Sequence, residues 1–73
     1  MPRYFFNVRN HIDAEDFEGR ELADLTTATQ EAQMDVADII RARFETLGNW
    51  SRWSIEICDA DRVLLKVVPF STN

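Results

Sequence analysis

Hydrophobic residues alternate with period two at the start of the chain. Tyr4 and Phe6 fall on one face of an extended strand and Phe5 on the other, because successive side chains of a strand point to opposite faces. We therefore predict a strand over residues 2–9. A chain of 73 residues has little material to cover both faces of a sheet, so it is an open question what covers Phe5.

The pattern changes to a helical period over residues 24–47. Apolar residues recur there at steps of three and four, which places them on one face of a helix. Asp24 is the predicted N-cap, although Thr27 with Gln30 also fits a capping box. Gly48 is the predicted C-terminal cap. The apolar positions are Leu25, Ala28, Ala32, Val36, Ile39, Ile40, Phe44 and Leu47.

Three further strands are predicted. Period-two alternation indicates a hairpin with strands at residues 53–58 and 63–70, joined by a turn at residues 59–62 that contains two Asp residues. A short strand is also expected within residues 10–23, where Gly19 favours a tight turn.

Charge and apolar pattern select a register for the hairpin. We predict that Ile57 lies opposite Leu65. Glu56 then lies opposite Lys66 on the other face, which is a favourable cross-strand pair.

Together the elements predict an α+β domain over residues 1–73, in the order ββαββ. It consists of a small antiparallel sheet with one long helix packed on one face. Residues 63–70 form the most apolar strand, so we place them centrally. With the strands numbered along the chain, the predicted sheet order is 3-4-1-2.

Composition excludes several classes of function. The net charge is −5 and acids outnumber bases 13 to 8, which disfavours binding to nucleic acid or to an anionic membrane. No apolar run is long enough to cross a bilayer, and the N-terminus lacks the pattern of a signal peptide. The single cysteine excludes an intrachain disulfide. We therefore expect a cytoplasmic protein.

Catalytic chemistry has little support in the sequence. His11 is followed by Asp13, Glu15 and Asp16, a group that we interpret as a solvated acidic loop rather than a metal site. Cys58 lies in a predicted strand and is interpreted as a packing residue rather than a nucleophile. No glycine-rich phosphate loop is present. We expect neither enzymatic activity nor a cofactor.

An acidic stripe follows the outer face of the predicted helix. It consists of Glu31, Asp35 and Asp38, at steps of four and three. Like charges at this spacing repel each other. The stripe is either a solubilising surface, partly neutralised by Arg41, or a contact surface for a basic protein partner.

Three motifs together resemble a known family. They are PRYFF at residues 2–6, EGREL with DL at residues 18–25, and VLL with VPF at residues 63–70. The chain resembles a family of short bacterial proteins that is classified as a domain of unknown function. That family usually has Gly in its last hairpin turn, whereas residues 59–62 contain none. The resemblance implies a single bacterial domain and points to no particular activity, cofactor or partner.

The predicted fold leaves one sheet face without a helix. In the predicted register this face carries Phe5, Leu64, Val68 and Phe70, and monomers rarely expose such a patch. We therefore predict a small non-catalytic interaction or assembly module that forms a homodimer through these residues. Alternatively, residues 10–23 fold across the patch. Other candidate functions are a small-molecule binding domain and an antitoxin-like acidic partner of a basic protein.

Overall fold

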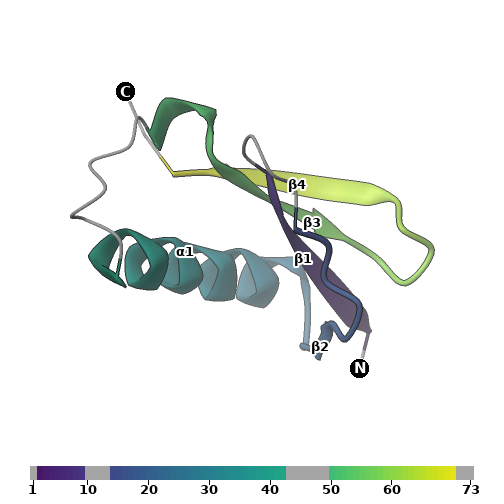
Figure 1. The fold of residues 1–73 in the computed structure, drawn as a ribbon. Coiled ribbons are helices and arrows are strands. Elements are labelled where there is room, and N and C mark those ends of the chain that lie inside the picture. The colour runs from purple at the N-terminus through teal and green to yellow at the C-terminus, as the bar shows by residue number, and fades with distance from the viewer. Residues whose placement is uncertain (1, 10–13, 43–49, 71–73) are drawn as a thin grey trace.

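The computed structural model describes residues 2–9, 14–42 and 50–70. Within these residues the chain forms a four-stranded antiparallel sheet and one α-helix, in the order ββαββ (Figure 1). The predicted α+β class is confirmed. The elements are β1 (Arg3–Arg9), β2 (Arg20–Glu21), α1 (Leu25–Ala42), the short 3-10 helix η2 (Trp50–Arg52), β3 (Ser54–Cys58) and β4 (Leu64–Pro69).

The strand order differs from the prediction. The sheet runs β2-β1-β3-β4, so β3 is the neighbour of β1 and β4 is an edge strand. The reason lies partly in Pro69. The Phe70 N–H donates to the Trp53 carbonyl, and since hydrogen-bonding direction alternates along a strand, position 69 faces away from β3. Proline lacks an N–H and fits such an outward position only on an edge strand.

The hairpin register also differs from the prediction, because β4 contains a β-bulge. Cys58 lies opposite Leu64, as the predicted register requires, but Ile57 lies opposite Lys66 rather than Leu65. One extra residue has been inserted in β4 at this point. Every later residue of β4 therefore changes its face, and Ile55 pairs with Val68.

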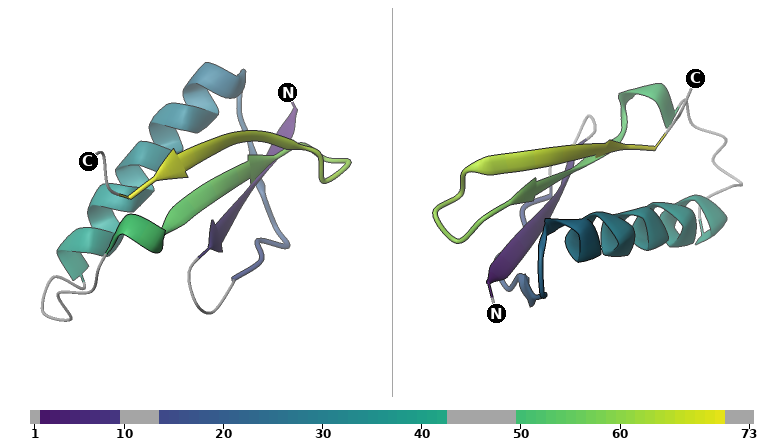
Figure 2. Two further views of the ribbon diagram at one scale, coloured as in Figure 1. Left: turned by 90° about the horizontal axis from the view of Figure 1, so that it is seen from above. Right: turned by 180° about the vertical axis from the view of Figure 1, so that it is seen from behind.

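Helix α1 covers one face of the sheet (Figure 2). Its residues Ala28 and Ala32 are fully buried, and their small side chains let the helix backbone approach the sheet closely. The turn between β3 and β4 extends beyond the N-terminal end of α1, so the helix does not cover this part of the hairpin (Figure 1). The buried core residues that face α1 are Tyr4, Phe6, Ile55, Ile57 and Val68 from the strands and Phe70 directly after β4.

An aromatic cluster closes the core near η2. The rings of Trp50 and Phe70 are stacked with centroids 5.5 Å apart, and Trp53 meets Trp50 edge to face at 4.8 Å. Trp53 is only partly buried but packs against the core, as predicted. The predicted end of the helix at residue 47 and the Gly48 cap lie outside the described residues.

The N-terminus of α1 is capped by Asp24, as predicted. Its Oδ1 accepts a hydrogen bond of 2.8 Å from the Thr27 N–H, and this bond lowers the pKa of the carboxyl group. Among the described helices, none combines the length and the apolar character needed to cross a membrane.

We expect Asp24→Ala to lower the free energy of unfolding and with it the urea midpoint, because the Thr27 N–H loses its acceptor. Urea denaturation followed by circular dichroism would measure this. The control is Asp61→Ala, which removes an exposed carboxylate in the β3–β4 turn and leaves α1 intact. An equal loss in the two variants would contradict the capping role.

Candidate functional site

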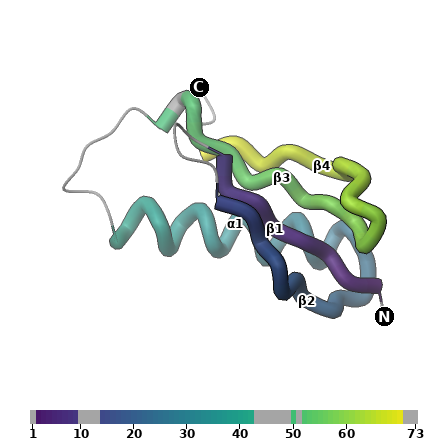
Figure 3. Tube along the Cα trace, turned by 45° about the vertical axis from the view of Figure 1, so that its right-hand side comes forward, coloured from purple at the N-terminus to yellow at the C-terminus, as the bar shows by residue number. Residues whose placement is uncertain are grey.

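The outer edge of β1 is bonded to a returning segment of the chain (Figure 3). Val8 and Ala14 exchange two backbone hydrogen bonds of 3.0 and 2.9 Å, and Tyr4 pairs with Arg20 in β2. Between these points the chain leaves the strand, and we call residues 14–19 the 14–19 loop. The ladder stays closed here because the Asp16 side chain replaces a backbone acceptor. Its Oδ2 accepts a 3.0 Å bond from the Phe6 N–H.

The Asp16 carboxylate also organises the loop itself. Its Oδ1 accepts bonds from the N–H groups of Glu18 and Gly19, at 3.1 and 3.0 Å. The Asp16 N–H in turn donates to Oδ1 of the buried Asn7, at 2.8 Å. Burial alone would raise the pKa of Asp16, but the N–H donors of Gly19, Phe6 and Glu18 outweigh burial and hold this pKa below its ordinary value.

Gly19 lets the loop approach β1 closely. Its φ of +71° lies in the left-handed region that favours glycine. A Cβ at this position would lie 2.9 Å from the carbonyl oxygen of Tyr4 and 3.0 Å from the ring of Phe5. The tight turn predicted around Gly19 is thus confirmed, and contact with β1 requires this residue type.

The chain itself covers Phe5. Arg62, which has a φ of 66° in the β3–β4 turn, donates from Nη1 to the Asp16 carbonyl oxygen at 3.0 Å. Its guanidinium lies 4.1 Å from the centroid of the Phe5 ring, close enough for a cation–π interaction. Phe5 is consequently only 9% exposed. We predicted as an alternative that residues 10–23 fold across this face. The 14–19 loop does so, and the Arg62 side chain also covers Phe5.

Two other residues of the predicted interface lie on the opposite face. Val68 and Phe70 are buried in the core below α1, because the bulge in β4 reverses the faces that follow it. Their predicted place beside Phe5 is therefore wrong. Leu64 is exposed and lies opposite Cys58, on the face of Phe5.

An exposed apolar surface remains along β4. We call it the β4 surface, and its residues are between 40% and 54% exposed. Val67 lies opposite Glu56 and so shares with Leu64 the face turned away from α1. Lys66, between them in the chain, is exposed as well. The apolar residues of the β4 surface are Val63, Leu64, Leu65 and Val67.

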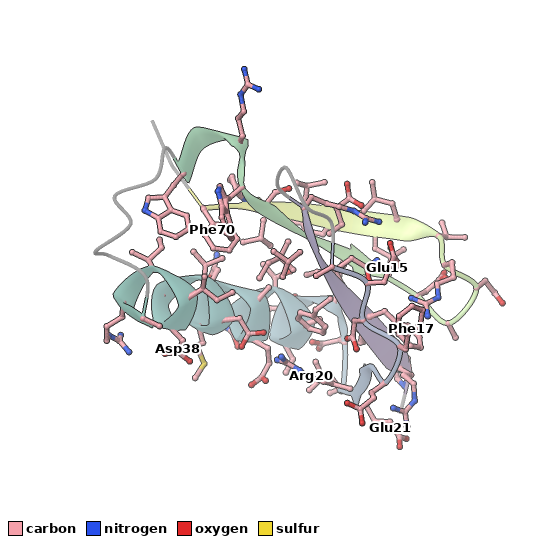
Figure 4. All side chains as sticks on the ribbon, viewed as in Figure 1. Glu15, Phe17, Arg20, Glu21, Asp38 and Phe70 are labelled. Carbon is pink, nitrogen blue, oxygen red and sulfur yellow. The ribbon has the colours of Figure 1, made fainter. Side chains whose placement is uncertain are left out.

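A groove of about 440 Å³ lies on the other side of the molecule, between α1 and the 14–19 loop. Apolar residues of the sheet and of α1 line it together with acidic residues of α1 and of the 14–19 loop. Figure 4 shows Arg20 between the helix and the strands, with Asp38 further along α1 and Glu15 on the side of the sheet. The apolar lining residues are Phe6, Val8, Ala14, Ile39 and Ile55, and the acidic ones are Glu15, Asp16, Glu18, Asp35 and Asp38.

Arg20 neutralises part of the predicted acidic stripe. It forms ion pairs with Glu31 at 3.2 Å and with Asp35 at 2.6 Å, and its guanidinium lies 4.5 Å from the Phe6 ring centroid. Partial burial would lower the pKa of Arg20, but Asp35 and Glu31 raise it. Asp38 pairs with Arg41 at 3.1 Å, as predicted. The spacing of the acidic residues along the helix could not predict Arg20 as their partner, because Arg20 lies in β2.

The remaining reactive side chains have structural partners. Cys58 is buried and accepts a 3.6 Å hydrogen bond from Nδ2 of Asn7; burial and the charge of Glu56 raise the pKa of its thiol. Arg9 forms ion pairs with Glu15 at 2.8 Å and with Glu56 at 2.9 Å, which raise the pKa of its guanidinium.

The described residues contain no cluster of three or more potential metal ligands. His11 and Asp13 lie outside these residues, so the structure describes only Glu15 and Asp16 of the acidic group that follows His11. Of these, the Glu15 carboxylate binds Arg9 and the Asp16 carboxylate binds backbone N–H groups.

Comparison with protein families matches residues 3–71 to DUF6894, a domain of unknown function. The chain belongs to this family. The predicted resemblance to a domain of unknown function is thereby confirmed over most of the chain. No curated protein and no solved structure matches it.

We expect Asp16→Asn to lower the free energy of unfolding at pH 7 by about 1.5–3 kcal/mol. Both oxygens of Asp16 face N–H donors, so an amide NH₂ in place of either oxygen leaves a donor against a donor. The lowered pKa of Asp16 means that its contribution is present above the unfolded-state pKa of about 3.9 and is lost as the pH falls through the folded-state value.

The measurement is urea denaturation of both proteins from pH 7 down to pH 2. The stability difference between wild type and Asp16→Asn should shrink below about pH 4. Asp61→Asn is the control for the loss of one charge. A stability difference under about 0.5 kcal/mol at pH 7 would contradict the role given to Asp16.

Proposed function

We propose that the protein is a small non-catalytic assembly module that forms a homodimer through the β4 surface. The observation that carries this proposal is the exposure of four neighbouring apolar residues, Val63, Leu64, Leu65 and Val67, at the edge of the sheet. Contiguous exposed apolar side chains mark interaction surfaces on small domains. Fully burying one such side chain contributes roughly 1.5–3 kcal/mol, so burying its exposed half contributes about half of that, and a two-fold contact does this once in each copy.

The proposed contact is between side chains rather than between strand edges. β4 carries three features that oppose the addition of another strand. Its bulge interrupts a regular edge, Lys66 places a charge on it, and Pro69 removes an outward N–H donor. Two copies would therefore pack the faces that carry Leu64 and Val67 against each other.

This interface keeps only part of the one predicted from the sequence. Leu64 belongs to both, whereas Phe5 is covered by Arg62, and Val68 and Phe70 belong to the core. Phe17 in the 14–19 loop is also exposed, and its ring centroid lies 6.0 Å from the Arg62 guanidinium.

The proposal also includes the class of partner and the cellular compartment. The net charge of −5 supports a protein partner over nucleic acid or an anionic membrane. The buried thiol of Cys58, the one cysteine of the chain, supports a reducing compartment, and we place the module in the cytoplasm.

Sedimentation equilibrium between 5 and 200 µM, roughly the range where weak dimers dissociate, tests the dimer. We expect the wild type to sediment at twice the chain mass of 8.5 kDa in the upper part of this range. The double variant Leu64→Glu, Val67→Glu should sediment as a monomer with an unchanged circular dichroism spectrum, because both side chains are exposed.

Met34→Glu is the matched control, because Met34 is an exposed apolar residue on α1, away from β4. This variant should remain a dimer. A wild type of 8.5 kDa at every concentration would refute the dimer, and dissociation of Met34→Glu to the same extent would refute the assigned surface.

A further inference from the structure

The groove beside α1 combines an apolar floor with acidic sides. Phe6 and Ile55 from the sheet and Ile39 from the helix lie along the floor. At about 440 Å³ the groove falls within the range of ordinary ligand sites. Five acidic residues and Arg20 line it, and acids outnumber bases there even though the Glu15 carboxylate pairs with Arg9, so its field attracts cations. An apolar floor between acidic sides fits a ligand with a positive charge on an apolar stem.

Arg20 shows which cation this environment accommodates. Its guanidinium lies over the Phe6 ring at 4.5 Å and bridges Glu31 and Asp35 on α1. A planar guanidinium can stack on an aromatic ring and bind carboxylates at its edge at the same time, whereas the rounded ammonium of lysine stacks less well. The groove is thus chemically suited to guanidinium groups.

Two acidic residues of the groove lining, one from the 14–19 loop and one from α1, are candidates to bind a second guanidinium. Glu18 belongs to the 14–19 loop, and its carboxylate has no side-chain partner among the described residues. Asp38 belongs to α1 and pairs with Arg41, but both side chains are about 70% exposed or more, so solvent already competes for this pair. The Asp16 and Asp35 carboxylates are held by backbone N–H groups and by Arg20.

We propose that the groove binds an arginine side chain from an extended segment of a partner protein, with Glu18 and Asp38 as the carboxylates that receive it. The apolar floor accepts the stem of this arginine or a neighbouring aliphatic side chain. This site is separate from the β4 surface and does not depend on the dimer. It differs from the acidic stripe of α1 in using the 14–19 loop as its second side.

The test uses two synthetic probes, an acetylated and amidated Gly-Leu-Arg-Leu-Gly peptide and the same peptide with citrulline in place of arginine. Citrulline keeps the shape of the side chain and lacks the charge. Binding is followed by ¹H–¹⁵N chemical shifts during titration at low salt. We expect the arginine peptide to bind and to shift the amides of Glu18, Gly19, Arg20 and Ile39. The citrulline peptide should bind more weakly by roughly tenfold or more.

Protein variants locate the site. Glu18→Gln combined with Asp38→Asn should weaken binding of the arginine peptide by roughly fivefold or more, since two charge-assisted contacts are lost. Glu21→Gln combined with Asp61→Asn is the matched control, because it removes the same net charge outside the groove and should change the affinity less than about twofold. Both pairs are exposed or at the rim, and thermal unfolding confirms that the fold is kept.

Several results would overturn the proposal. Equal binding of the two peptides would show that the charge is not recognised. Equal weakening in the two variant pairs would show general electrostatic attraction rather than a site. Shifts confined to residues 63–67 would place the peptide on the β4 surface, and spermidine binding the groove more tightly than the arginine peptide would identify a small amine as its ligand.

Discussion

The structure depends on one carboxylate that takes the place of a backbone hydrogen-bond acceptor at the outer edge of β1. Asp16 accepts the Phe6 N–H at the outer edge of β1 and, through its other oxygen, the N–H groups of Glu18 and Gly19. A single side chain therefore closes the edge and folds the 14–19 loop against the second sheet face. The loop carbonyl of Asp16 then binds Arg62, which covers Phe5. In this way a chain with one α-helix in its described part also covers its second sheet face at Phe5.

The cover formed by Arg62 and the 14–19 loop determines which surfaces stay exposed and are available to a partner. Arg62 and the 14–19 loop cover Phe5 in β1, so the apolar residues left exposed at the sheet are those of the β4 surface, at the opposite edge. The same loop forms one side of the groove, whose other side is α1. The two proposed contacts therefore lie on different parts of the molecule, and a dimer that used the β4 surface would leave the groove accessible on each copy.

Local patterns were sufficient to predict the elements and the pairing of β1 with β2 and of β3 with β4, but not the pairing of β1 with β3 or the register beyond the bulge. The strand at Tyr4–Phe6, the Asp24 cap and the turn at residues 59–62 follow from nearest neighbours in the chain, and each is present. The bulge at Leu65 has no local signature, and it alone moves Val68 and Phe70 to the other face. Pro69 indicates an edge strand, whereas the apolar content of residues 63–70 favours a central one, and β4 lies at the edge. The Asp16 and Arg20 partners lie on other elements, so spacing could not predict them.

Hydrogen exchange at the Phe6 amide tests the central role of Asp16 most directly. This N–H points to the outer edge of β1, and its acceptor in the structure is the Asp16 side chain. NMR-detected exchange in the wild type should therefore show Phe6 protected to within about tenfold of Asn7, whose amide lies in the ladder with β3. Exchange of Phe6 at the rate of an unprotected peptide, with Asn7 still protected, would show that the carboxylate does not close this edge and would contradict the account.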